Sequence, residues 1–141
     1  VGSMVVRWKD FKSLTFDPYQ THTRLMGYLD FKEPKVLRGR VNTRDGQLYK
    51  GKFIFDLDEQ WDFETIEGNE GTLRYSIALR NISLIEPQPS NATVVVLKNG
   101  RKLLLNGHHD VTDKNWGVLA WKEGTSPKYL PWKSVQSIYL P

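Results

Sequence analysis

One spacing pattern of apolar residues occurs three times in this sequence of 141 residues. Its steps are two, three and three, and its members are Val6, Trp8, Phe11 and Leu14, then Ile77, Leu79, Ile82 and Ile85, then Leu130, Trp132, Val135 and Ile138. A step of two is typical of a strand, and a step of three keeps side chains on one side of a tight 3₁₀ turn. Each occurrence therefore predicts a strand, a single 3₁₀ turn and a second strand. We call this arrangement a closing corner, and we expect its apolar side chains to face inward.

The two later closing corners end two similar stretches of sequence. Asp45-Gly46 and Asn99-Gly100 both lie between β-prone runs, where such pairs are strong hairpin signals. The second of these pairs follows the first by 54 positions, and Asp110 follows Asp56 by the same number. Within the closing corners the offset becomes 53, so that Ile82 corresponds to Val135. This similarity predicts a tandem duplication of a β unit of about fifty residues.

The chain contains no long segment with helical periodicity, so the predicted fold class is all-β. We expect two tandem five-stranded small barrels with 3₁₀ closing turns, preceded by an N-terminal strand pair. The predicted boundaries are 1–35 for the strand pair and its connector, 36–87 for the first barrel and 88–141 for the second. Residues 87–91 (Pro-Gln-Pro-Ser-Asn) are the expected linker between the barrels.

The run from Leu130 to Val135 resembles the last strand of PRC-barrel domains. The whole five-stranded layout is similar to Src-homology-type and Sm-like barrels. The resemblance implies a small-barrel fold for residues 36–141. It implies no catalytic residue, because the motifs that carry it, Asp45-Gly46 and Pro131-Trp132, are structural. The first unit has Ala78-Leu79 where the second has Pro131-Trp132.

The net charge of +4 is unevenly distributed along the chain. Residues 89–141 have seven basic and three acidic side chains, whereas residues 36–88 have seven and nine. A basic second barrel could bind nucleic acid, and single-strand binders combine basic residues with exposed aromatic rings. The candidate residues for such binding are Lys98, Arg101, Lys102, Lys114, Lys122, Trp116 and Trp121. The alternative is a solvated, lysine-rich surface with both tryptophans mostly buried.

Two loops carry residues that could hold a metal ion. Asp56, Asp58 and Glu59 offer the oxygen ligands that calcium prefers, and His108, His109 and Asp110 combine imidazoles with a carboxylate. Adjacent histidines in an extended loop point in opposite directions, which argues against a shared ion. The alternative is a pair of polar turns in which Asp56 and Asp110 bind the backbone.

These observations predict a non-catalytic binding or scaffold module, part of a larger protein, with a protein or small-molecule partner. The alternatives are a nucleic-acid-binding module that uses the second barrel and a metal-dependent enzyme at the loop 108–113. We expect no cofactor. The chain has no cysteine, no apolar run of membrane-spanning length and no signal peptide. A leader removed ahead of the first residue would indicate a periplasmic or secreted protein, and otherwise we expect a cytoplasmic one.

Overall fold

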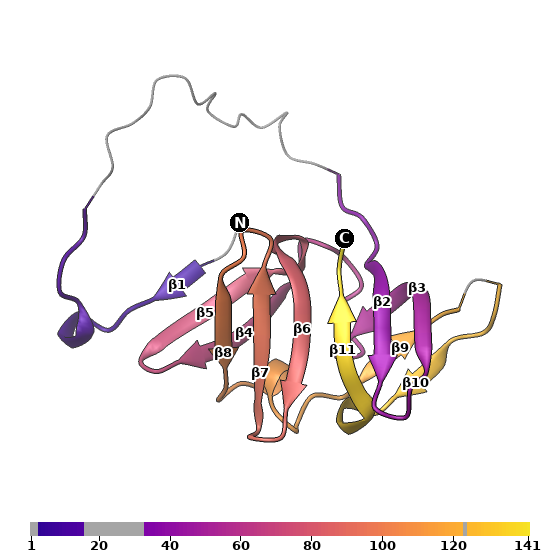
Figure 1. Ribbon diagram of the computed structural model, residues 1–141. Helices are drawn as coiled ribbons and strands as arrows, with labels where there is room; N and C mark the ends of the chain where they lie inside the picture. Colours follow the sequence, from indigo (N-terminus) through magenta and orange to yellow (C-terminus); the bar gives the residue numbers. More distant parts are fainter. Residues whose placement is uncertain (1–2, 16–32, 123) are drawn as a thin grey trace.

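The computed structural model describes residues 3–15, 33–122 and 124–141 of an all-β protein. Its strands form two antiparallel sheets (Figure 1). The larger sheet has the order β10-β9-β3-β2-β11-β6-β7-β8 and the smaller has the order β1-β5-β4. The strands are β1 (Ser3–Val5), β2 (Arg38–Thr43), β3 (Leu48–Phe55), β4 (Thr65–Glu70), β5 (Leu73–Ala78), β6 (Ile82–Gln88), β7 (Ala92–Leu97), β8 (Lys102–Leu105), β9 (Val118–Ala120), β10 (Lys128–Leu130) and β11 (Val135–Tyr139).

The helical elements within the described ranges are four single turns of 3₁₀ helix. They are η1 (Trp8–Asp10), η3 (Leu79–Asn81), η4 (His109–Val111) and η5 (Trp132–Ser134). None of the helices in these ranges is long and apolar enough to cross a membrane.

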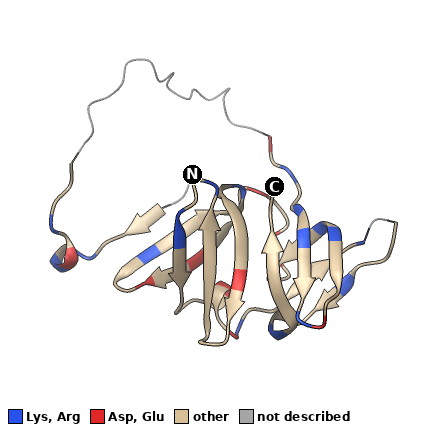
Figure 2. Ribbon diagram, viewed as in Figure 1, with Lys and Arg blue, Asp and Glu red and all other residues tan. Residues whose placement is uncertain are grey.

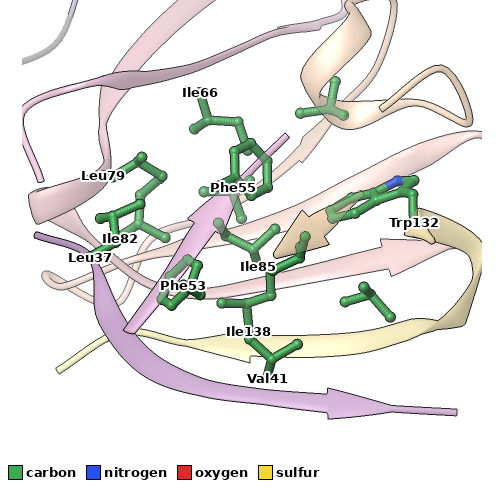
Figure 3. Close-up of a cluster of buried hydrophobic side chains, with 14 of the residues drawn as sticks. Leu37, Val41, Phe53, Phe55, Ile66, Leu79, Ile82, Ile85, Trp132 and Ile138 are labelled. Atoms are coloured by element: carbon green, nitrogen blue, oxygen red, sulfur yellow. The ribbon is translucent and has the colours of Figure 1, made fainter. Parts of the chain in front are cut away.

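The two later closing corners are confirmed, because η3 connects β5 to β6 and η5 connects β10 to β11. Their side chains face inward as predicted: Leu79, Ile82, Val135 and Ile138 are fully buried, and Trp132 is 6% exposed. Figure 3 shows Trp132 near Phe55 in the core. The two rings meet edge-on, with 5.7 Å between their centres. The corners thus supply much of the hydrophobic core.

The first occurrence of the pattern forms only part of a closing corner. β1 pairs with β5, and η1 follows at the expected position. The predicted second strand is wrong, however, because residues 11–15 form no strand. Trp8 is 84% exposed and Leu14 62% exposed, and Figure 1 shows this segment leading away from the sheets. A strand needs a neighbouring edge with which to pair, and no described residue offers one here.

The predicted linker at 87–91 is also wrong. Pro87 and Gln88 belong to β6 and pair with Thr93 and Ala92 of β7, so the segment is the turn of a hairpin. Residues on both sides of this turn share the larger sheet. Within it, β11 pairs with both β2 and β6.

The pairing of β6 with β11 places Ile85 directly opposite Ile138. These are the two residues that the offset of 53 makes equivalent. Both isoleucines are fully buried, so this pairing lies in the core.

Candidate functional site

The two predicted metal-binding loops lie against each other. Asp56 begins the turn after β3 in the left-handed conformation, with φ of 49°, and Leu57 follows with φ of 65°. Such values are unfavourable for most residues other than glycine, although aspartate tolerates them better than leucine does. Hydrogen bonds between the backbones of Phe55 and Glu59, at 2.8 and 3.0 Å, hold the turn. It places Asp56, which is 2% exposed, 3.2 Å from His109 Nε2 in the other loop.

The two histidines point to different carboxylates, in agreement with their expected opposite directions. His108 lies 3.0 Å from Asp110 and 3.2 Å from Glu67, whereas His109 faces Asp56. The six predicted ligand residues therefore do not surround one point. Among the residues that the structure describes, Asp56, Asp58 and Glu59 are the one group that brings three carboxylate oxygens within 4.8 Å of one another.

Burial and neighbouring negative charges favour the protonated forms of Asp56 and Glu59 by raising the pKa of each. Burial raises the pKa of Asp56 to about 6. Burial, together with a hydrogen bond to Asp58 and the neighbouring charges, raises the pKa of Glu59 to about 9. Glu59 therefore carries a proton at neutral pH, and the group of carboxyls can exist without a cation.

The two equivalent aspartates also bind distant backbone groups. Asp56 accepts a hydrogen bond from the N–H of Trp116, and Asp110 accepts one from the N–H of Glu67 at 2.6 Å. Each bond joins two parts of the chain that are far apart in sequence. These contacts give Asp56 and Asp110 a structural role in fixing their turns.

A second candidate lies on the outer face of the β2–β3 hairpin. Arg38 is directly opposite Lys52, and Arg40 is directly opposite Lys50. Like charges in such cross-strand positions are destabilising, by roughly the 0.2–1 kcal/mol that favourable pairs contribute. None of the four forms a salt bridge with another residue in the described ranges. Figure 2 shows the concentration of basic residues on this hairpin.

These four cations line a surface groove of about 890 Å³, which we call the hairpin groove. Lys122 is a fifth cation in its wall, and no described residue of the lining is acidic. Aromatic rings lie among the cations: Arg40 is 4.6 Å from the ring centre of Tyr139, and Lys52 is 5.1 Å from that of Trp121. The described lining of the groove therefore combines positive charge with aromatic surface.

The predicted nucleic-acid residues are distributed over several surfaces. Trp121 and Lys122 line the hairpin groove, but Lys98 does not. Arg101 donates to the hydroxyl of Tyr75, and Lys102 is exposed on β8. The expectation that Trp116 is buried is wrong. Trp116 lies between η4 and β9, outside any strand, and its side chain is 57% exposed; its ring meets that of His109 edge-on, with 4.7 Å between the ring centres.

The sequence analysis did not predict the four hairpin cations as binding residues, because residues 36–88, which contain them, are net acidic. A signal was nevertheless present. Arg38 and Arg40 precede the Asp45-Gly46 turn at about the same distances at which Lys52 and Lys50 follow it. A hairpin with this turn pairs residues at equal distances, so the register could have brought them together.

Comparisons of the chain with protein-family models, with curated proteins and with solved structures found no match.

Proposed function

We propose that this protein is a non-catalytic binding module whose ligand is single-stranded nucleic acid, held in the hairpin groove. The observation that carries the proposal is the opposition of Arg38 to Lys52 and of Arg40 to Lys50 without an acidic residue in the described lining. Two like-charge pairs reduce stability unless an anion lies across them. A chain of phosphates supplies such an anion, and its binding releases counterions.

The aromatic rings favour a single strand over a duplex as the ligand. Tyr139 is 39% exposed, and the partly buried Trp121 lies in the same groove. Unpaired bases stack on exposed rings, with about 1–3 kcal/mol per base, and this contact requires no particular sequence. The bases of a duplex are already stacked on one another and cannot use the rings in this way.

We also propose that the strands belong to two interleaved small barrels. The support is the sheet order, in which β2 and β3 of the first unit are flanked by β9, β10 and β11 of the second. Apart from β1, the remaining strands are β4 to β8, which form one continuous stretch of chain. The resemblance to small barrels agrees with a binding role, since such barrels commonly present ligand surfaces on their strands.

The experiment that tests the binding proposal is a fluorescence-anisotropy titration of a thymidine dodecamer at several salt concentrations. With four phosphate contacts, log K should fall against log salt with a slope of about −3. The double variant Arg40→Glu/Lys50→Glu should weaken binding at least about tenfold and make the slope shallower by about 1.4.

The matched control is Lys102→Glu/Lys114→Glu, which makes the same change in charge at two exposed positions outside the hairpin groove. It should leave the affinity nearly unchanged. An equal loss in both double variants would show that only net charge matters, and the proposed site would then be wrong.

A further inference from the structure

A second groove of about 870 Å³ lies beside the hairpin groove. The two share Arg38, Leu140 and Pro141 in their linings. We call the second one the adjacent groove. Because Arg38 belongs to both, a ligand that leaves the hairpin groove past Arg38 enters the adjacent groove directly.

The adjacent groove repeats the chemistry of the first. Lys35 and Lys98 are exposed cations in its lining, and Trp61 supplies an aromatic ring. Asp62 is the only acidic residue in the described lining. Its carboxylate is already engaged, with Arg80 at 3.1 Å and with the backbone N–H of Lys35 at 3.1 Å.

Arg80 also contributes a hydrogen-bond donor without a partner. Its Nε is buried and makes no hydrogen bond to another residue of the described ranges, although its Nη2 is paired with Asp62. A buried donor that is left unsatisfied is unfavourable, by roughly 1–3 kcal/mol. Arg80 belongs to the lining of the adjacent groove, and phosphate oxygens are strong acceptors for guanidinium groups.

We infer that the two grooves bind one continuous strand of nucleic acid, with Arg38 at the junction. This inference rests on the proposed function and extends it to the size of the site. Once the hairpin groove holds one end of a strand, the adjacent groove binds the next nucleotides in an intramolecular step. Affinity therefore increases with strand length until both grooves are filled, within the range of about 4–16 nucleotides that small barrels cover.

The test compares a thymidine tetramer with a thymidine dodecamer by fluorescence anisotropy. The wild-type protein should bind the dodecamer more tightly, by at least the roughly 5- to 150-fold that one additional stacked base supplies. The double variant Lys35→Glu/Lys98→Glu should remove most of this gain. It should also make the salt slope for the dodecamer shallower by about 1.4, while tetramer binding stays unchanged.

Each outcome separates this inference from the proposed function. If the wild-type protein binds both lengths equally, or if Lys35→Glu/Lys98→Glu leaves the gain with length intact, the continuous path is wrong and the hairpin groove remains a site. If Lys35→Glu/Lys98→Glu weakens the tetramer as much as the dodecamer, the adjacent groove is not a separate segment of the path. If neither length binds to the wild type, the proposed function fails as well. Lys102→Glu/Lys114→Glu again serves as the control for net charge.

Discussion

At the scale of single residues, the hairpin groove depends on a glycine between its two arginines. A Cβ atom on Gly39 would lie 2.1 Å from the carbonyl oxygen of Tyr139 and 3.2 Å from the ring of Phe53. Real Cβ atoms do not approach a backbone so closely, so any side chain here would push β11 away from β2. The absence of a side chain thus brings Tyr139 within reach of Arg40.

We therefore predict that Gly39→Ala reduces the free energy of unfolding by about 1–3 kcal/mol or more, as overpacking does. Urea denaturation measures this change. Gly46→Ala is the comparison, because a Cβ atom on Gly46 would meet nothing within 4 Å and only the positive φ of 84° opposes it. That change should cost about 1–2 kcal/mol. Equal stability of Gly39→Ala and the wild type would show that the close approach of β11 is wrong.

The carboxyl cluster gives stability a dependence on pH. Burial raises the pKa of Asp56 to about 6 and that of Glu59 to about 9, above their values in the unfolded chain. Between the unfolded and folded pKa values, the folded protein binds more protons than the unfolded one. The free energy of unfolding should therefore fall as the pH rises from about 5 to about 9.

Glu59→Gln keeps the shape of the side chain and removes its titratable group. The free energy of unfolding of the variant should therefore fall less than that of the wild type over this pH range. Denaturant midpoints at several pH values measure the effect. Asp113→Asn, at an exposed position, is the control and should follow the wild-type profile. A wild-type profile that rises toward pH 9 would contradict the raised pKa values.

At the scale of elements, the same spacing pattern produced different results in different surroundings. Trp132 and Trp8 both begin a 3₁₀ turn, yet Trp132 is 6% exposed and Trp8 is 84% exposed. The spacing could predict the turn, because local sterics set it. It could not predict burial at residues 11–15, because burial requires a strand from elsewhere in the fold.

This contrast gives a matched pair of substitutions. Trp132→Ala should reduce the free energy of unfolding by about 3–5 kcal/mol, because it removes a buried ring that packs on Phe55. Trp8→Ala should change stability by no more than about 0.5 kcal/mol. Guanidinium denaturation monitored by circular dichroism distinguishes the two. A large loss in Trp8→Ala would mean that η1 packs against the rest of the protein.

At the scale of the whole molecule, the sequence predicted the all-β class and both hairpins, but the strand order came only from the structure. The two predicted units have similar apolar patterns, so the sequence alone does not distinguish strand pairing within a predicted unit from pairing between the two. The observed sheet uses pairing between units, with β9 beside β3 and β11 beside β2. We call this pairing of β9 with β3 and of β11 with β2 the strand exchange. The strand exchange forms the hairpin groove, because it brings Trp121 and Tyr139 to the cations of β2 and β3.

Because of this strand exchange, we predict that residues 88–141 do not fold as an isolated fragment. β9 and β11 would lose β3, β2 and β6 as neighbours, and their apolar side chains would be exposed. The nuclear magnetic resonance spectrum of this fragment should show little chemical-shift dispersion, whereas residues 33–141 should give a dispersed spectrum. A well-dispersed spectrum from the short fragment would mean that the second unit can close on itself.

The binding proposal is tested most directly by the position of the ligand on the protein. In an amide nuclear magnetic resonance titration with a thymidine dodecamer, we predict shifts for Arg38, Arg40, Lys50, Lys52 and the indole N–H of Trp121. Shifts confined to the loop at 108–113, or no shifts at low salt, would contradict the account.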